Sequence, residues 1–235
     1  MPMTKAGSPL SDTIKPPLWV NAEITYKCPL HCVFCYNPLN YASTFEKELT
    51  TEQWLKALRE ARELGAVQLG ISGGEPLMRD DCEEIVAEAS KMGYYVNLLT
   101  SGIGLTEERI AAFKAGGLDQ IQLSFQDSTK EMNDFLSSTR TFDLKRKVAR
   151  LIKQYDYPMV LNVVLHRLNI DHIEQILQMA EEMEAEVDRQ QRDGHRGEEF
   201  QHRGGQEGQA QHAHGALAKG MADRLDLGAA SGAAE

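Results

Sequence analysis

Three cysteines in one short segment are the residues of this chain best suited to chemistry. Cys28, Cys32 and Cys35 are spaced C-x3-C-x2-C. Cysteine thiolates are the usual ligands of a cubane iron–sulfur cluster. Three thiolates from one loop can hold three irons and leave the fourth iron open to a substrate. The spacing therefore indicates a cluster with one accessible iron.

Two other interpretations of these cysteines are possible. The three positions would share one face of a helix and could be core residues, but Pro29 and a strand predicted just before the loop argue against a helix. Zinc could bind the three thiolates and His31, but structural zinc sites usually combine two cysteine knuckles, and no second knuckle is present. The fourth cysteine, Cys82, falls in a predicted helix, and we expect it to be a small unligated hydrophobe.

A second motif, Gly73-Gly74-Glu75-Pro76, follows a predicted strand. Two glycines let the backbone come close to a ligand, and backbone carbonyls together with the Glu75 carboxylate suit an ammonium group. Paired glycines are also common in ordinary turns. The position of the motif, one helix and one strand after the cysteine loop, therefore favours a ligand-binding role over an ordinary turn.

Apolar periodicity predicts alternating strands and helices that would position both loops. Predicted strands cover 18–26, 66–71, 94–100, 118–125 and 158–165, and predicted helices cover 51–64, 80–92, 106–115, 142–155 and 170–184. Alternation of this kind predicts an α/β fold with a parallel sheet. The sheet would be part of a (β/α) barrel or a doubly wound open sheet, and either would place the site at the carboxyl ends of the strands.

The composition excludes several classes of protein. The 235 residues carry a formal net charge of −10, so a basic face for non-specific nucleic-acid binding is not expected. No apolar run is long enough to cross a membrane. We see no secretory signal pattern and expect a cytoplasmic protein, in which clustered cysteines indicate metal chemistry rather than disulfides.

The chain divides into three parts by composition. Residues 1–17 are expected to be a flexible arm, residues 18–186 a folded core, and residues 187–235 a low-complexity tail with nine of the 19 glycines. Three origins of the tail stay open. They are a frameshift or truncated gene, which we favour, a genuine divergent tail, and a metal-binding tail using His195, His202, His212 and His214.

The cysteine loop followed by Gly-Gly-Glu-Pro resembles the radical S-adenosylmethionine (SAM) superfamily. Within it, several stretches resemble the family of coenzyme PQQ synthesis protein E (PqqE), radical SAM cyclases of the PqqA peptide; these are Glu23–Leu30, Leu64–Gly70, Leu99–Gly102, Asp119–Gln126 and Pro158–Asn162. The resemblance runs from about Leu18 to Glu184 and implies a partial (β/α) barrel. The last strand of that barrel would then be missing, because the tail begins where that strand is expected. The cysteine-rich SPASM extension of the family would also be missing, because no cysteine follows Cys82.

The resemblance also implies cofactors and residue roles. One [4Fe-4S] cluster would be ligated by Cys28, Cys32 and Cys35, and SAM would bind to its open iron. Phe34 would pack near the adenine, and the amino group would contact Gly73, Gly74 and Glu75. The SAM carboxylate or ribose would contact Ser101, Ser124 and Gln126, and Asn162 and His166 would face the cavity. For these last five residues an ordinary turn, core or surface role stays equally open.

A reaction and partners follow from the same resemblance. A 5′-deoxyadenosyl radical would abstract hydrogen from PqqA, and a glutamate and a tyrosine side chain of that peptide would become cross-linked. A small chaperone, PqqD, would present the peptide, and a flavodoxin-type reductant would supply electrons. Two alternatives stay open: another radical SAM enzyme that modifies peptides or matures heme, and a non-catalytic remnant that keeps the fold.

Overall fold

The computed structural model describes residues 15–35, 37 and 48–185. The first fourteen residues of the predicted arm lie outside this part, and so does the whole predicted tail, including its four histidines. In the described part, no helix is both long enough and apolar enough to cross a bilayer.

Five parallel strands form one sheet, in the order in which they occur along the chain. They are β1 (Trp19–Glu23), β2 (Gln68–Ser72), β3 (Tyr95–Thr100), β4 (Gln120–Ser124) and β5 (Met159–Asn162). A doubly wound sheet reverses its strand order at a switch point, and this sheet does not. The sequential order therefore selects the partial barrel over the open alternative, and among the described residues β1 and β5 remain the two unpaired ends.

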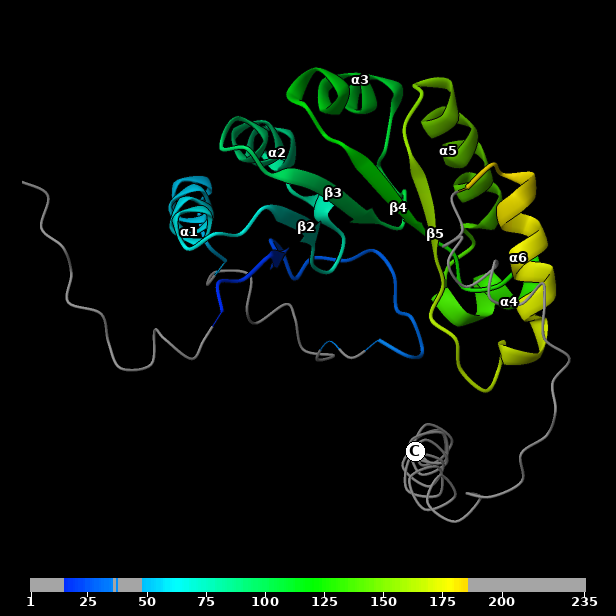
Figure 1. Cartoon of the computed structure of the whole chain (residues 1–235). Coiled ribbons are helices and arrows are strands. Elements are labelled where there is room, and N and C mark those ends of the chain that lie inside the picture. The colour runs from blue at the N-terminus through cyan, green and yellow to red at the C-terminus, as the bar shows by residue number, and fades with distance from the viewer. Residues whose placement is uncertain (1–14, 36, 38–47, 186–235) are drawn as a thin grey trace, which may run out of the picture. The chain divides into compact units, whose positions relative to one another are not determined.

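The predicted helices are confirmed, with small changes at their ends, and they lie along one face of the sheet (Figure 1). They are α1 (Thr51–Glu63), α2 (Cys82–Lys91), α3 (Glu107–Gly116), α5 (Phe142–Gln154) and α6 (Ile173–Glu182). Side-chain caps explain where two of them begin. Thr50 and Gln53 form a capping box at α1, and the Thr106 side chain accepts a hydrogen bond from the backbone of Arg109 at α3.

Three short elements differ from the sequence prediction. The helix predicted at 170–184 begins with a 3-10 turn, η4 (Ile170–His172), and a second such turn, η3 (Pro76–Met78), follows the Gly-Gly-Glu loop. A whole helix, α4 (Lys130–Ser137), lies between β4 and α5 and was not predicted. Its segment is rich in polar residues, and its buried face is made partly of Asn133 and Ser137, so it carries little apolar signal.

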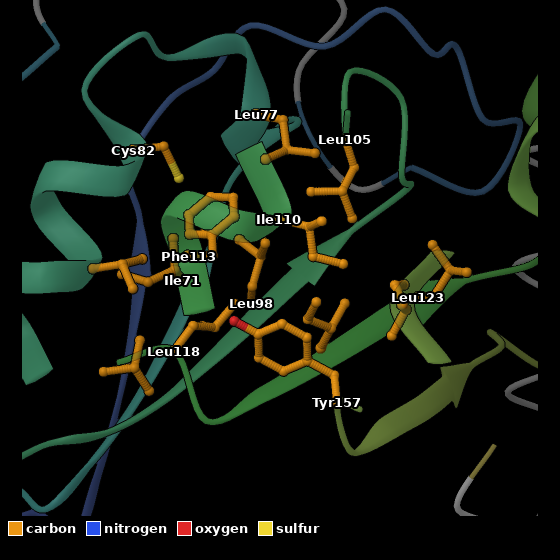
Figure 2. Packing of buried hydrophobic residues seen from close by; sticks show 14 of the residues in the cluster. Ile71, Leu77, Cys82, Leu98, Leu105, Ile110, Phe113, Leu118, Leu123 and Tyr157 are labelled. Atoms are coloured by element: carbon orange, nitrogen blue, oxygen red, sulfur yellow. The ribbon is translucent and has the colours of Figure 1, made fainter. Parts of the chain in front are cut away.

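The two faces of the sheet differ because side chains alternate along each strand. One lateral row, at the helix-covered face, is apolar and almost completely buried, and consists of Ala22, Ile71, Leu98, Ile121 and Met159. Figure 2 shows Ile71, Leu98 and Leu123 packed with side chains of the helices. Cys82 is fully buried in this core, as expected of an unligated thiol, and Trp54 packs against the core's edge.

The opposite face of the sheet is more polar, although Leu99 on β3 and Val160 on β5 also lie on it. Its side chains include Asn97 on β3, Gln122 and Ser124 on β4, and Asn162 on β5. Ser124 and Asn162 are register partners at the carboxyl ends of their strands. This polar face, rather than the helix-covered core, is therefore available to a ligand.

Candidate functional site

One cavity of about 530 Å³ lies at the carboxyl ends of the strands. It is lined by eleven of the residues singled out in the sequence, which are Cys28, Cys32, Phe34, Cys35, Gly73, Gly74, Glu75, Ser101, Ser124, Gln126 and Asn162. These residues come from the loops after β1, β2 and β3 and from the ends of β4 and β5. His166 is not part of the lining. The fold thus brings the two motifs together at the edge of the sheet where ligands of parallel sheets bind.

The Gly-Gly-Glu loop is locked to the segment that leads into the cysteine loop. The backbone amide of Gly74 donates to the Thr25 carbonyl at 2.7 Å, and the Glu75 amide donates to the Lys27 carbonyl at 2.8 Å. A β-carbon at Gly73 would lie 2.4 Å from the Thr25 carbonyl oxygen, and one at Gly74 would lie 2.4 Å from the Lys27 carbonyl oxygen. The glycines are therefore required for the close approach of two protein backbones.

The Glu75 carboxylate is buried and saturated by donors of the chain itself. Oε1 accepts from the Thr100 hydroxyl at 2.6 Å and from the Leu77 amide at 3.1 Å. Oε2 accepts from the amide and the hydroxyl of Ser101, at 2.7 and 2.5 Å. Burial raises the pKa of Glu75, and the bonds from Ser101 and Thr100 oppose this rise. Four donors fill the four lone-pair positions of a carboxylate, so the carboxylate ties the loop after β2 to the loop after β3.

This arrangement bears on the predicted roles of Glu75 and Ser101. Contact of the Glu75 carboxylate with an ammonium group stays a prediction, but its oxygens are already used by internal donors. The Ser101 hydroxyl likewise donates to Glu75, so its proton is not available to another acceptor in this arrangement. Gly73 and Gly74 line the cavity, and contact of their backbone carbonyls with an ammonium group stays a prediction.

The cysteine loop is held more loosely, by the helix that the sequence did not predict. The backbone amide of Val33 donates to the Leu136 carbonyl at 3.0 Å, and that of His31 donates to the Ser137 carbonyl at 3.3 Å. Both acceptors belong to the last turn of α4, whose carbonyls lack partners within the helix. Cys32 lies between these two bonds, so α4 sets the position of the middle cysteine.

The three thiols of the cysteine loop differ in burial. Cys28 and Cys32 are partly buried and Cys35 is exposed. Burial raises the pKa of Cys28 to about 11 and raises the pKa of Cys32, although the charge of Lys145 opposes the rise at Cys32. Thiols must lose their protons to bind iron, so cluster binding would replace these protons with metal.

A single metal ion fits this donor set less well. Among residues 15–35, 37 and 48–185, no three His, Cys, Asp or Glu side chains converge closely enough to hold one ion. The zinc alternative requires the three thiols and His31 to converge in that way. A cubane spreads its ligands over separate irons, and the three cysteines line one shared cavity.

Phe34 and His166 form one aromatic pair at the rim of the site. Their ring centroids are 5.3 Å apart, and the rings are tilted by 35°. The His166 Nδ1 accepts from the Leu168 amide at 3.2 Å, which assigns the proton of the neutral ring to Nε2. Burial lowers the pKa of His166 and favours this neutral form. The His166 ring therefore packs against Phe34, a role that the sequence left open.

Gln126 is fixed through its backbone by two asparagines that the sequence analysis did not select. Its amide donates to the Asn133 Oδ1 at 3.0 Å, and its carbonyl accepts from the Asn169 Nδ2 at 2.8 Å. Both asparagines are fully buried. A buried Asn with satisfied bonds holds a loop in one conformation, and this frees the Gln126 side chain to face the cavity.

Lys145 is the charged residue near the site that sequence reasoning missed. It lies in the first turn of α5 and is completely buried. Two signals could have found it. It occupies the apolar stripe of this helix, between Phe142 and Val148, and a cation is unfavourable at a helix N-terminus.

The comparisons with known proteins agree with this geometry. A family model described as the radical SAM superfamily matches residues 22–180. The fold is similar to SuiB of Streptococcus suis, solved bound to the precursor peptide SuiA, with a TM-score of 0.66 and 19% identity over 75% of this chain and 40% of that chain.

Two other solved structures share the fold. Native anSMEcpe, solved with S-adenosylmethionine and the Kp18Cys peptide, has a TM-score of 0.59 and 18% identity over 72% of this chain and 49% of that chain. Methylornithine synthase (PylB) has a TM-score of 0.59 and 16% identity over 73% of this chain and 52% of that chain. The chain thus spans between two fifths and just over half of the length of these neighbours. With the family model matching most of its length, the chain belongs to the radical SAM superfamily.

Proposed function

We propose that Cys28, Cys32 and Cys35 hold a [4Fe-4S] cluster and that SAM binds beside it in the same cavity. Enzymes of this superfamily use both cofactors. The observation that carries the residue assignment is the single cavity lined by all three thiols and by the Gly-Gly-Glu loop. When bound, the two cofactors supply a one-electron cleavage of SAM that yields a radical able to take hydrogen from a substrate.

The residues of the chain bind and orient SAM rather than react with it. The carbonyls of Gly73 and Gly74 accept from the amino group of SAM, while Glu75 keeps that loop in place through Ser101 and Thr100. Phe34, supported by the His166 ring, packs against the adenine. The polar groups of Ser124, Gln126 and Asn162 face the same cavity and receive the carboxylate and the ribose.

We further infer that the substrate is a peptide, and specifically PqqA. Two solved neighbours, SuiB and anSMEcpe, were captured with peptides. The stretches Glu23–Leu30 and Asp119–Gln126 resemble the PqqE family, which favours cross-linking of a glutamate and a tyrosine of PqqA. PqqD would present the peptide, and a flavodoxin-type protein would be the reductant.

Turnover of the peptide tests this substrate. The anaerobically reconstituted chain is incubated with PqqA, PqqD, SAM and dithionite, and the peptide is analysed by mass spectrometry. A product lighter by two hydrogens, with the new bond between glutamate and tyrosine carbons, is expected. An unchanged peptide accompanied by rapid SAM cleavage would remove PqqA as the substrate.

A second candidate is modification of a different peptide. The same two neighbours carry peptides other than PqqA, so the shared fold favours a peptide but does not favour one sequence. Deuterium transfer from a panel of labelled peptides into 5′-deoxyadenosine distinguishes the candidates, because only a true substrate gives up hydrogen to the cofactor.

A further inference from the structure

A buried lysine without a partner lies next to the proposed cofactor site. The Lys145 side chain is 0% exposed, and among the described residues its Nζ has no hydrogen-bond partner. Its backbone amide donates to the Thr141 carbonyl at 2.9 Å, which places it in the first turn of α5. That turn lies at the cavity end of the helix, because α5 follows the carboxyl end of β4.

The position is unfavourable for a cation in two respects. An unpaired ammonium is costly to bury, and the helix N-terminus carries a partial positive charge. The positions around it on the same stripe are the apolar Phe142, Val148, Ala149 and Ile152, so an apolar side chain would fit the pattern. A lysine at this position therefore needs an anion from outside the helix.

The groups around the Lys145 ammonium indicate which anion could pair with it. Lys145 Nζ lies 5.7 Å from the centre of the Phe125 ring, which offers a weak interaction only. The groups whose negative forms would act on Lys145 are, from first to last, Cys32, Glu75, Asp134 and Cys28. Desolvation lowers the pKa of Lys145 to about 8, and these four groups oppose the shift.

Two of these four groups are already engaged. The Glu75 carboxylate accepts four bonds from Thr100, Ser101 and Leu77. The Asp134 Oδ1 accepts from the amides of Thr141 and Phe142. Neutral donors leave both carboxylates charged, but neither carboxylate bonds to the Lys145 Nζ. Cys32 stands first among the four groups that act on Lys145, and it is one of the sulfurs that would become charged on binding iron.

The same hydrogen bonds fix the lysine relative to the cysteine loop. Asp134 of α4 holds the first residues of α5, and the last carbonyls of α4 hold the backbone of Val33 and His31 on either side of Cys32. The lysine and the loop are thus positioned through one short helix.

We propose that Lys145 is the counter-charge of the iron–sulfur cluster and makes that cluster easier to reduce. The inference rests on the proposed cluster at Cys28, Cys32 and Cys35. Reduction adds one negative charge to the cluster, and a fixed cation in a poorly solvated site stabilises the reduced form more than the oxidised form. Lys145 would therefore act on the electron-transfer step that precedes cleavage of SAM.

Redox titration of the cluster tests the inference without SAM and without substrate. The variants are Lys145→Met, which removes the charge, Lys145→Arg, which keeps it, and Lys147→Met, which removes an exposed charge from the same helix. Each protein is reconstituted anaerobically, its iron and sulfide are measured, and the reduced cluster is followed by electron paramagnetic resonance at set potentials.

At a fixed potential, the ratio of reduced to oxidised cluster in Lys145→Met should fall about tenfold, or about 59 mV for a one-electron couple. Lys145→Arg and Lys147→Met should stay within about twofold of the parent, since both keep the buried charge. A parent-like ratio in Lys145→Met would overturn the inference.

If Lys145→Met does not fold, a second neutral variant replaces it. Lys145→Gln is then titrated in its place. Loss of the cluster from both neutral variants, with retention in Lys145→Arg, supports a required counter-charge, and a parent-like potential in Lys145→Gln contradicts it. A parent protein that binds no cluster would refute the proposed function itself, which keeps the two failures distinct.

Discussion

The two loops that meet in the cavity are held in opposite ways. The Gly-Gly-Glu loop is held firmly. Its backbone bonds to Thr25 and Lys27, and its buried Glu75 carboxylate accepts four hydrogen bonds. The cysteine loop is half-exposed and rests on two backbone bonds to the end of α4. One loop is therefore organised before any ligand arrives. The other has fewer bonds of its own and, under the proposed function, would gain order from the cluster.

The Gly-Gly-Glu loop and the cysteine loop are thus suited to different tasks in the site. A preorganised loop avoids an ordering cost when a small molecule binds, which suits the loop proposed to hold SAM. A loop that exchanges its thiol protons for iron can reorganise during assembly, because metal binding contributes free energy of folding. Substitutions in the two loops should therefore have different effects, and the largest effect is expected at the cysteines.

The cysteine loop should control iron and little else. Cys32→Ser should reduce the iron content from about four per chain to below one, because the cluster loses its central ligand. Iron and sulfide analysis after reconstitution measures this. Cys82→Ala, which changes a core thiol, should keep about four irons. A parent that holds substantially more than four would show that other ligands exist.

The Gly-Gly-Glu loop should control stability even without iron. Glu75→Gln places an amide group against the Ser101 or Thr100 donors and should lower the free energy of unfolding by about 3 kcal/mol. Urea unfolding of the iron-free protein measures the loss. Glu84→Gln, at an exposed position of α2, should change the stability by less than about 0.5 kcal/mol. Equal losses of unfolding free energy in the two variants would contradict the claim that internal donors saturate the Glu75 carboxylate.

The close backbone approach should be visible in glycine variants. Gly74→Ala puts a β-carbon 2.4 Å from the Lys27 carbonyl oxygen and should cost about 2 kcal/mol, because two backbones must separate. Gly104→Ala is the matched control. Gly104 has φ of +88°, and an added β-carbon there would meet only ordinary contacts at 3.9 and 4.0 Å, so it should cost about 1 kcal/mol. Thermal unfolding of the iron-free protein measures the loss of stability in both variants. A larger loss in Gly104→Ala than in Gly74→Ala would refute the steric argument.

The smallest expected effect concerns Arg79, beneath both loops. Its guanidinium donates to the Ile24 carbonyl at 3.0 Å and pairs with Asp81. This pairing lowers the pKa of Asp81. Stability from the pair is therefore present above the unfolded pKa of aspartate and is lost as the pH falls through the lower folded value.

Replacing Asp81 should show that pH dependence. Asp81→Asn should cost about 1 kcal/mol or less at pH 7, because the pair is partly solvated, and should cost progressively less toward pH 3. Denaturant midpoints across this range provide the measurement. A cost that does not change with pH would remove the ion pair from the explanation.

Much of the fold could be predicted because its signals are local. Apolar periodicity located all five strands and the five larger helices, and Thr50, Thr106 and Gly117 mark helix ends through their own side chains or backbone. The choice between a barrel and a doubly wound sheet could not be made in this way, because strand order is decided by packing between distant segments.

The site was partly predictable for a related reason. Short-range motifs such as the cysteine spacing identify ligands directly, but the groups that support those ligands come from elsewhere. The polar helix α4 gave no apolar period, and Asn133, Asn169 and Lys145 resemble ordinary surface residues until their burial is known. The saturation of Glu75 by Ser101 and Thr100 likewise depends on the pairing of β2 with β3.

Cleavage of SAM by the reconstituted protein is the most direct test of the central claim, that the cavity joins the two loops into one cofactor site. The protein is loaded with iron and sulfide anaerobically, then given dithionite and SAM, and 5′-deoxyadenosine is quantified by chromatography. The parent should form it, whereas Cys32→Ser should form none above background. A parent that carries about four irons yet forms no 5′-deoxyadenosine would contradict the account.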